Sequence, residues 1–527
     1  MSRDFQLPGR SPVIACEGMA ATSHPLASLA AVEALRAGGN AADAAVTAVA
    51  VLCVVEPQMT GIGGDCFCML HVPGQPVWGY NGSGRAGARA SLETLMARGI
   101  SAIAGDSIHA VTVPGAIDAW AAILDAQGRF SLDRALAPAI HYAERGFPVA
   151  ARVAWDWAWE VGKLRGDAGA ARHFLFEGRA PAEGDVVKLP ALARTLRTIA
   201  AKGPRAFYEG PIADDIVATV AARGSFLAAE DFARHRGEVV APISTNYRGL
   251  DVLELPPNTQ GLTALVLLNI LERFDLAALD PLGPDRFHLA LEAARLAYAV
   301  RDTHVADPAF MRAAVPALLD KGFAAELAGR IDRARRMPRA RAPALGNDTV
   351  YLTVVDRDRM AVSLINTLFS HFGVGICTQE TGIMLTNRGA CFVVDPDHPN
   401  TFGPNKRPMH TIIPALGFRG GRCEFSFGVM GSHYQPMGHV QVVTNIVDYA
   451  MDVQAAIDAP RAFFVGETTV VERGLPPASV EGLRARGHQV ALAPLPWGGA
   501  QAIRIDWERG VLMGGSDPRK DGCALGY

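Results

Sequence analysis

A threonine at the start of an apolar run is the residue of this sequence best placed to do chemistry. Residues 333–343, rich in arginine and proline, come before it, and the strand-like run 349–355 follows Asp348 directly. Cleavage after Asp348 would make Thr349 a new N-terminus, which carries a hydroxyl nucleophile and an α-amine base on one residue. Because the Thr349 hydroxyl could itself attack the Asp348 carbonyl, the sequence predicts a self-cleaving precursor. The alternative is an ordinary strand threonine that follows a loop.

Two further segments could complete a site around Thr349. Thr367 would return to Thr349 if the chain between them folds as a hairpin, and its hydroxyl could then orient the nucleophile. Residues 428–433 follow a strand-like run, and a glycine-bearing turn of this kind can present backbone N–H groups to an oxyanion. Each segment also has a structural explanation, as a plain strand threonine and a common turn. His410 and His433 could line the pocket, although a lone histidine is more often structural.

Cofactor and metal motifs are not evident in the sequence. The glycine-rich segment 61–64 lacks the spacing of dinucleotide and phosphate loops, so we expect it to serve packing. Cys66 and Cys68 form a C-x-C, but no second pair follows at zinc spacing. We therefore expect no cofactor and no metal, and we expect all eight cysteines to be reduced and structural.

Composition places the chain among ordinary globular proteins. It has 527 residues, of which 49% are hydrophobic and 20% charged, and a net charge of -3 argues against nucleic-acid or membrane-surface partners. The N-terminus shows no apolar signal-peptide core, and the early apolar run 41–55 is too short to span a bilayer. We expect a cytoplasmic protein that acts on a small molecule.

Hydrophobic patterning predicts helices covering strands. Residues 25–60 predict two helices separated by Gly38-Gly39-Asn40, with Asn40 as the N-cap of the second. Residues 331–348 have the composition of a linker. Strands between helical layers favour a layered α/β sandwich. The other predicted helices are 116–125, 191–201, 263–274, 287–300 and 439–449, and the predicted strands are 66–72, 247–255, 351–355, 360–365, 382–385, 424–430, 501–506 and 511–514.

Several sequence blocks follow one another in a defined order along nearly the whole chain. The blocks are residues 38–45, residues 55–64, Tyr247-Arg248-Gly249, Pro256-Pro257, residues 268–272, Asp307-Pro308-Ala309-Phe310, Asp348-Thr349, Val354-Val355-Asp356, Ala361-Val362-Ser363, Phe372-Gly373-Val374-Gly375 and Lys406-Arg407-Pro408. Together they resemble the γ-glutamyltransferase family of N-terminal-nucleophile hydrolases, and their number and order make the resemblance specific.

The resemblance implies both a fold and a set of roles. The fold would be an αββα sandwich built from a proenzyme that cuts itself into a large chain, 1–348, and a small chain, 349–527, which form a heterodimer or a dimer of heterodimers. Thr349 would be the nucleophile and Thr367 its orienting partner. The backbone of Gly431 and Ser432 would form the oxyanion hole.

Substrate-binding positions depart from the family pattern. The family arginine that holds the glutamyl α-carboxylate falls on Ser83, and Arg85 lies two residues later. The acidic residue for the α-ammonium falls on Cys391, just after Arg388. An ammonium buried without a partner is costly, so such a pocket should bind a glutamyl group poorly. Either arginine would suit a carboxylate.

Other departures point the same way. The family asparagine after the orienting threonine is Phe369, and its paired serines fall on His410 and Thr411. The Asn81-Gly82-Ser83-Gly84-Arg85 pattern with Asn387-Arg388-Gly389 resembles the γ-glutamyltransferase-like subgroup, which includes oxamate amidohydrolases and acylases. We therefore expect an amidohydrolase for a small, oxamate-like amide that carries a carboxylate. The alternatives are a γ-glutamyltransferase or glutathione hydrolase, and an uncut scaffold protein.

Overall fold

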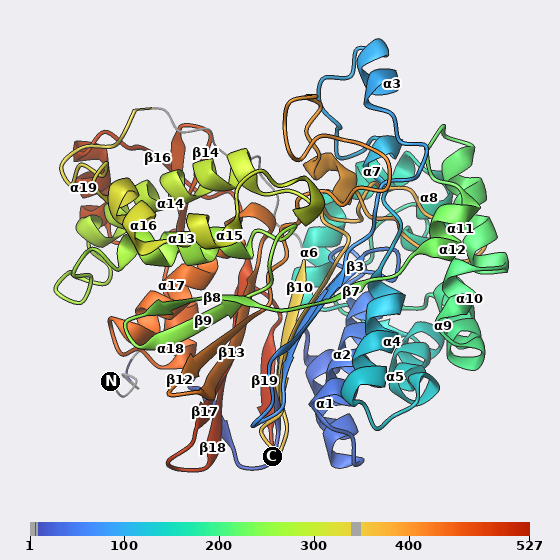
Figure 1. Cartoon of the computed structure of the whole chain (residues 1–527). Coiled ribbons are helices and arrows are strands. Elements are labelled where there is room, and N and C mark those ends of the chain that lie inside the picture. The colour runs from blue at the N-terminus through green and yellow to red at the C-terminus, as the bar shows by residue number, and fades with distance from the viewer. Residues whose placement is uncertain (1–5, 7–8, 339–348) are drawn as a thin grey trace.

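Two seven-stranded sheets lie face to face at the centre of the molecule (Figure 1). The computed structural model describes residues 6, 9–338 and 349–527. In hydrogen-bonding order, the first sheet is β19 (Cys523–Gly526), β2 (Met19–Thr22), β10 (Val350–Val355), β11 (Ala361–Thr367), β3 (Asp65–His71), β4 (Trp78–Gly82) and β7 (Glu238–Val240). The second sheet is β1 (Val13–Ala15), β18 (Val511–Ser516), β17 (Gly499–Asp506), β13 (Arg422–Met430), β12 (Ala415–Arg419), β9 (Leu250–Glu254) and β8 (Ile243–Tyr247).

Helices cover the outer face of each sheet, which confirms the predicted αββα sandwich (Figure 1). One layer contains α1 (Pro25–Arg36), α2 (Ala41–Val55), α4 (Ala116–Gln127), α5 (Leu132–Arg145) and α9 (Pro190–Lys202). The other contains α13 (Gly261–Leu271), α14 (Pro284–His304), α16 (Lys321–Ala328), α17 (Gln435–Val447), α18 (Val453–Asp458) and α19 (Pro477–Ala485).

Short elements complete the fold. The helices are α3 (Leu92–Ala97), α6 (Ala151–Trp159), α7 (Val161–Arg165), α8 (Ala168–Phe174), α10 (Arg205–Tyr208), α11 (Pro211–Ala221), α12 (Ala229–Arg234) and α15 (Val315–Leu318). The strands are β5 (Phe147–Pro148), which pairs with β6 (Val186–Val187), and β14 (Ala462–Val465), β15 (Thr468–Val471) and β16 (Gln489–Leu492), which form a small third sheet.

The predicted N-cap of α2 is confirmed. The Asn40 side chain accepts hydrogen bonds from the amides of Ala42 and Asp43, and the Asp43 carboxylate accepts one from the Asn40 amide, which closes a capping box. Every residue of α2 is buried, because this helix packs against α1, α5 and β10 at once. The alanine-rich sequence permits that close approach from several sides.

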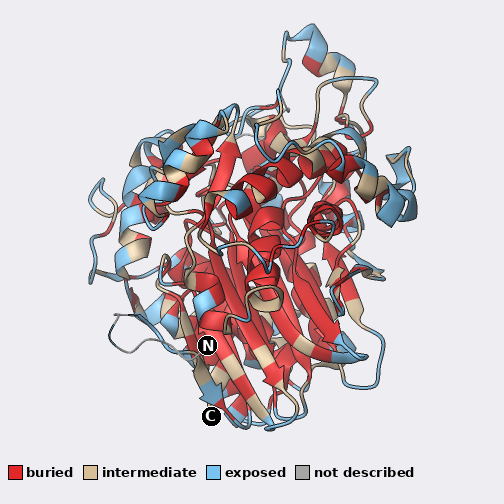
Figure 2. Cartoon of the chain, turned by 90° about the vertical axis from the view of Figure 1, so that its left-hand side faces the viewer, coloured by how far each residue is buried: buried red, intermediate tan, exposed pale blue. Residues whose placement is uncertain are grey.

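Strand β10, which begins directly after Thr349, lies in the middle of its sheet between β2 and β11. All six of its residues are buried, as Figure 2 shows for the central strands generally. One face meets α2, and the other meets β13 across the sandwich, where the Thr353 hydroxyl donates to Ser426 Oγ at 2.6 Å. The sequence of β10 is therefore mostly apolar rather than alternating, and its one threonine is hydrogen-bonded.

Two predicted strands differ in the structure. The segment 247–255 is the turn and second strand of a hairpin, β8–β9, because Arg248 and Gly249 both adopt positive φ angles, +50° and +84°, and reverse the chain. The segment 382–385 forms no strand, and only a bridge between Met384 and Cys377 remains there. Its apolar side chains are buried in a loop instead of a ladder.

The predicted linker is seen only in its first part. Residues 331–338 form no helix or strand, and they are held by hydrogen bonds from the Arg336 amide to the Arg486 carbonyl and from the Met337 amide to Glu292 Oε2. Residues 339–348 lie outside the described residues. All eight cysteines are free, as expected. Within the described chain no helix is long and apolar enough to cross a membrane.

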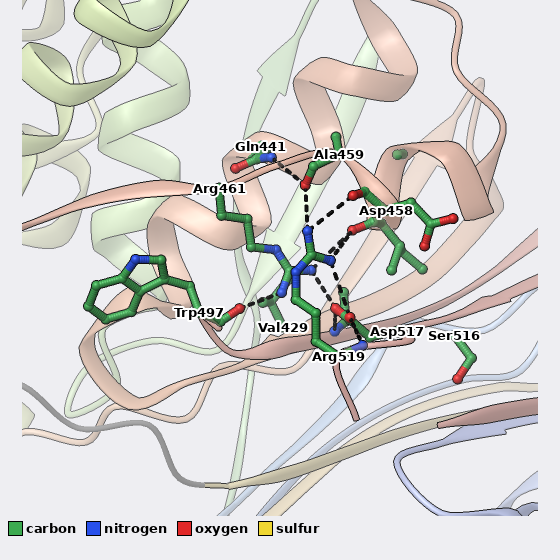
Figure 3. Close-up of polar contacts among 12 residues, drawn as sticks. Val429, Gln441, Asp458, Ala459, Arg461, Trp497, Ser516, Asp517 and Arg519 are labelled. Atoms are coloured by element: carbon green, nitrogen blue, oxygen red, sulfur yellow. Dashed lines mark hydrogen bonds and ion pairs between the residues drawn. The ribbon is translucent and has the colours of Figure 1, made fainter. Parts of the chain in front are cut away.

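An ionic cluster fastens α18 to the C-terminal segment (Figure 3). Asp517 is fully buried and accepts hydrogen bonds from Arg461 Nη2 at 2.5 Å and from the Ala500 amide at 2.8 Å. Arg519 completes the cluster by donating to Asp517 at 3.2 Å and to the carbonyl of Ala459 at 3.0 Å. These contacts join residues that would all belong to the small chain.

Candidate active site

Thr349 and Thr367 meet at the end of the β10–β11 hairpin. The register pairs Val350 with Asn366, so extending it by one residue places Thr349 opposite Thr367. Their hydroxyl oxygens lie 3.1 Å apart and both residues are buried, which confirms the contact predicted from the sequence. Thr367 Oγ1 also accepts a hydrogen bond from the Phe369 amide at 2.9 Å. Asp348, on the far side of the predicted cleavage point, lies outside the described residues.

The backbone at Thr349 is unusual for its residue type. Its φ angle is +152°, a value that a β-branched residue rarely adopts and that stores local strain. Behind Thr367, Gly64 approaches so closely that a Cβ there would lie 2.0 Å from the Thr367 carbonyl oxygen. The glycine-rich segment 61–64 therefore serves packing, as expected, and it supports the strand end that carries Thr367.

A tight turn links β13 to α17, and the ring of His433 in this turn lies 6.2 Å from the Phe369 ring, centroid to centroid. Gly431 has φ +127° and Ser432 has φ +51°, and a Cβ on Gly431 would lie 2.9 Å from the Gly498 Cα, so glycine is required there. The Ser432 Oγ atom is buried and has no hydrogen-bond partner among the described residues. The turn lies at the N-terminal end of α17, where the helix dipole favours negative charge.

Arg388 is fully buried and keeps one edge of its guanidinium without a hydrogen bond. Nη1 donates to Thr411 Oγ1 at 2.8 Å and approaches Cys391 Sγ at 3.8 Å, and the guanidinium stacks 4.1 Å from the centroid of the Phe369 ring. Nε and Nη2 have no hydrogen-bond partner in the described chain. These two N–H groups point the same way and match the two oxygens of a carboxylate. Although burial lowers the pKa of Arg388, an arginine stays charged near neutral pH.

Among the residues that the structure describes, Asp65 has the carboxylate nearest to Arg388, and its Oδ2 atom lies 4.0 Å from Arg388 Nε. Its two oxygens already accept hydrogen bonds, Oδ1 from the Gly84 amide at 2.9 Å and Oδ2 from His410 Nε2 at 3.0 Å. Asp65 starts β3, directly across from Thr367 in the sheet register. It therefore balances part of the Arg388 charge from the Nε side of the guanidinium, at a distance too long for a hydrogen bond.

His410 uses both ring nitrogens within the protein. Nδ1 accepts from the Ile412 amide at 3.3 Å, so Nε2 carries the proton and donates to Asp65. Burial, followed by the nearby charge of Arg388, lowers the pKa of His410 to about 3. The structure thus places this predicted substrate-binding residue behind Asp65, as a neutral support of the carboxylate.

Arg85 lies in different surroundings from Arg388. Its guanidinium contacts Glu238 at 2.7 Å, Asp307 at 3.2 Å and the Asn405 carbonyl at 3.0 Å, and its side chain is 35% exposed. None of these partners is among the residues described above around Thr349 and Arg388. The structure therefore brings Arg388, Thr411 and Phe369 together and leaves Arg85 in a surface ion-pair network.

Sequence reasoning missed three buried residues of this group. Asp65 carried a signal, since an acidic residue at the head of the apolar run 66–70 must have buried partners. Gln260 Nε2 donates to the carbonyls of Thr411 at 2.7 Å and Ser432 at 2.9 Å, and Arg301 Nη1 donates to Gln260 Oε1 at 2.8 Å. Nothing in the sequence around Gln260 or Arg301 indicated these contacts.

One group of described residues has the side-chain types of a metal site, namely His288, Glu292 and His488. Its two histidines already form hydrogen bonds within the protein, whereas Glu292 Oε1 has no hydrogen-bond partner among the described residues. His488 Nε2 lies 2.9 Å from His288 Nδ1, and His288 Nε2 donates to the Asp332 carbonyl at 2.7 Å. Arg295 lies 4.0 Å from Glu292 and would repel a cation. These contacts fit a structural network.

Comparisons with known proteins cover the whole site. The Gamma-glutamyltranspeptidase family profile matches residues 27–527. The glutathione hydrolase-like YwrD proenzyme of Bacillus subtilis is 40% identical over 527 residues, covering 98% of this chain and 99% of that protein. The oxamate amidohydrolase proenzyme of Klebsiella pneumoniae is 36% identical over 530 residues, covering 98% and 99%.

Solved structures agree with the sequence comparisons. The crystal structure of cephalosporin acylase from Bacillus halodurans superposes with a TM-score of 0.94 at 38% identity and covers 100% of this chain and 99% of that chain. The resemblance read from the sequence blocks is therefore confirmed along the full length. The chain belongs to the γ-glutamyltranspeptidase family and is one of its amide-hydrolysing enzymes, with the N-terminal-nucleophile fold.

Proposed function

We propose that this protein is a self-cleaving N-terminal-threonine amidohydrolase for a small amide that carries a carboxylate, with oxamate as the test substrate. The main observation in support of this proposal is the buried guanidinium of Arg388, whose Nε and Nη2 atoms have no hydrogen-bond partner among the described residues. Of the two arginines that the sequence offered, Arg388 is the one assigned to the substrate carboxylate.

Self-cleavage would generate the catalytic group. The Thr349 hydroxyl attacks the Asp348 carbonyl carbon, the peptide C–N bond breaks, and the acyl group passes to oxygen as an ester. That bond cleavage frees the α-amine of Thr349, and water then hydrolyses the ester, which releases the α-carboxylate of Asp348 and restores the Thr349 hydroxyl. The products are the large chain, 1–348, and the small chain, 349–527, held together as a heterodimer.

Substrate turnover would use the same oxygen. The Thr349 α-amine removes the hydroxyl proton, Thr349 Oγ1 attacks the amide carbon, and the oxyanion is stabilised by the backbone N–H groups of Gly431 and Ser432. The proton passes to the leaving nitrogen, which departs as ammonia and leaves an acyl ester on Thr349. Water, activated by the same α-amine, then releases the second carboxylate. Thr367, 3.1 Å from the nucleophile, holds the hydroxyl in position.

Arg388 suits a carboxylate next to the scissile carbonyl. Contacts of 4.1 Å from its guanidinium to the Phe369 ring, 2.9 Å from the Phe369 amide to Thr367, and 3.1 Å from Thr367 to Thr349 link it to the nucleophile. A charge-assisted hydrogen bond at a buried site contributes about 1.5–3 kcal/mol. A carboxylate bound by both free N–H groups would fix a small substrate in one orientation.

A γ-glutamyltransferase or glutathione hydrolase is the alternative, and one observation favours it. Asp65 lies 4.0 Å from Arg388, so the two could bind the ammonium and carboxylate of a glutamyl group. Against this, the Asp65 oxygens already accept from Gly84 and His410, and the position expected to be acidic is Cys391. The relatives include proteins named for both activities.

Intact mass and a substrate panel test the proposal together. We expect two chains, the smaller beginning at Thr349, and release of ammonia from oxamate that exceeds turnover of a γ-glutamyl anilide. Preference for the γ-glutamyl anilide would establish the alternative. A single uncut chain without activity would support the scaffold explanation and remove the nucleophile.

A further inference from the structure

The buried side chain of Gln260 joins the two halves of the candidate site. We propose that Gln260 is a positioning residue that fixes the oxyanion turn at Ser432 relative to the anion-binding segment at Thr411. This inference rests on the proposed function, because it assigns catalytic value to the distance between those two segments. Gln260 would act in addition to Thr349, the proposed nucleophile, and Arg388, the proposed partner of the substrate carboxylate.

Gln260 contacts both segments with one amide group. Nε2 donates to the Thr411 carbonyl at 2.7 Å and to the Ser432 carbonyl at 2.9 Å. Its backbone amide also donates to the His410 carbonyl at 2.8 Å. The Thr411 hydroxyl accepts a hydrogen bond from Arg388 Nη1, and Ser432 belongs to the turn between β13 and α17. One side chain therefore sets the spacing between the segment that would bind the carboxylate and the turn that would bind the oxyanion.

The orientation of the Gln260 amide is determined by its partners. The carbonyls of Thr411 and Ser432 can only accept hydrogen bonds, and the Arg301 guanidinium can only donate. A flipped amide would place Oε1 against two carbonyl oxygens and the NH₂ group against Arg301. The contact from Arg301 Nη1 to Gln260 Oε1, at 2.8 Å, thus fixes the direction in which the two N–H donors point.

Arg301 extends the same network to the residue after Ser432. Nη1 lies 3.1 Å from His433 Nδ1, which must accept, so the His433 proton resides on Nε2. Burial, with the charges of Arg301 and Arg388, holds the pKa of His433 well below its usual value, so the ring is neutral. Asp302 balances Arg301 with a contact of 2.7 Å. The network therefore keeps its geometry without a change of protonation near neutral pH.

Full burial makes this arrangement stiff. Gln260, Thr411 and Ser432 are all 0% exposed, so the three groups that Gln260 satisfies have no water to replace it. Loss of the side-chain amide would leave the Thr411 carbonyl and one Arg301 N–H without partners, and the Ser432 carbonyl would keep only its contact with the Gln435 amide. The turn and the His410–Thr411 segment would then shift. A displacement of about 1 Å at a catalytic group can lower the rate by roughly 100-fold.

Gln260→Met and Gln260→Glu test the proposal. Methionine keeps the length and volume but removes every side-chain hydrogen bond, whereas glutamate keeps the contact to Arg301 and removes both donors. We expect both variants to lower kcat/KM by about 10- to 100-fold, with most of the loss in kcat. We also expect slower self-cleavage, followed as the fraction of uncut chain over time.

Gln454→Met is the matched control. Gln454 is buried, donates to the Ser516 carbonyl at 2.9 Å and to Asp458 at 2.8 Å, and accepts from the Ser516 amide at 3.0 Å, in α18 away from the site. It should lower Tm as much as Gln260→Met does while kcat/KM stays unchanged. If the Gln260 variants fold, lose Tm like the control and keep wild-type kcat, Gln260 is merely structural and the proposal is overturned.

The choice of substrate separates this inference from the proposed function. Each variant is assayed on whichever of oxamate and a γ-glutamyl anilide the wild-type enzyme hydrolyses, and self-cleavage needs no added substrate. Failure of wild-type enzyme on oxamate alone would overturn the substrate assignment and leave the Gln260 comparison intact. Normal self-cleavage and normal turnover in Gln260→Glu would overturn the positioning role, whatever the substrate.

Discussion

Replacing Arg388 by lysine keeps the positive charge of the side chain and removes its pair of parallel N–H donors. Arg388 has two parallel N–H groups without hydrogen-bond partners, on Nε and Nη2, whereas a lysine ammonium in the same place is a point charge. Arg388→Lys should therefore keep the attraction for an anion and lose one of two charge-assisted hydrogen bonds. A bond of this kind contributes about 1.5–3 kcal/mol. The expected loss of kcat/KM for oxamate is about 10- to 150-fold.

Ammonia release measures the effect on two matched amides. Oxamide has an uncharged amide where oxamate has its carboxylate, so Arg388→Lys should slow oxamate hydrolysis and leave the low oxamide rate nearly unchanged. Arg85→Lys is the matched variant, because Arg85 already contacts Glu238 and Asp307. We expect wild-type KM for oxamate in that protein.

Two results would refute the reasoning about Arg388. Equal losses on oxamate and oxamide would mean that Arg388 supports the fold around Thr411 rather than the substrate carboxylate. A raised KM in Arg85→Lys together with a normal KM in Arg388→Lys would move the carboxylate to the surface network around Glu238. In either case the free guanidinium edge would need another explanation.

Three other changes test separate parts of the molecule. Thr349→Ala should remain one uncut chain, because the attacking hydroxyl is gone, and the intact mass of the denatured protein measures this. Two chains from this variant would refute the assignment of Thr349 as the nucleophile. Asp517→Asn should lower the free energy of unfolding by about 3–5 kcal/mol, since Arg461 keeps a buried charge without its partner; an unchanged urea midpoint would contradict this. Burial raises the pKa of Glu254, so the folded state holds that proton more tightly and stability falls as pH rises above about 4.3. Glu254→Gln removes this titration, and its Tm advantage over wild type should grow from pH 5 to pH 9, whereas parallel curves would refute the assignment.

Local patterns predicted what local contacts build. The helix expected at 191–201 is α9, Pro190–Lys202, and the strand expected at 424–430 is β13, Arg422–Met430. Both were predictable because the hydrophobic pattern of each segment keeps the same periodicity over its whole length. The contact between Thr349 and Thr367 was predictable for the same reason, since one hairpin joins them. The β8–β9 turn was missed because its signal is only the Arg248-Gly249 pair inside an otherwise strand-like run.

Long-range contacts were not predictable from one sequence. Gln260 meets Ser432 only because α13 and the end of β13 converge in the fold, and no spacing along the chain encodes that. The two candidate arginines show the same limit. Both are arginines in the sequence, and nothing there distinguishes Arg85 from Arg388. In the structure the Arg85 side chain is 35% exposed and has two carboxylate partners, whereas the Arg388 side chain is fully buried and has two N–H groups without hydrogen-bond partners.

Arg388 has two buried guanidinium nitrogens without hydrogen-bond partners among the described residues. Buried polar groups are normally hydrogen-bonded, and a buried cation with two unused donors costs stability unless a ligand supplies the acceptors. Asp65, at 4.0 Å, offsets the charge but leaves both donors unused, so the protein alone does not satisfy the group. Such exceptions are expected where function requires them. A carboxylate that supplied the missing acceptors would also stabilise the fold, so binding of an anion to Arg388 should raise Tm with its concentration, and Arg388→Lys should weaken that rise.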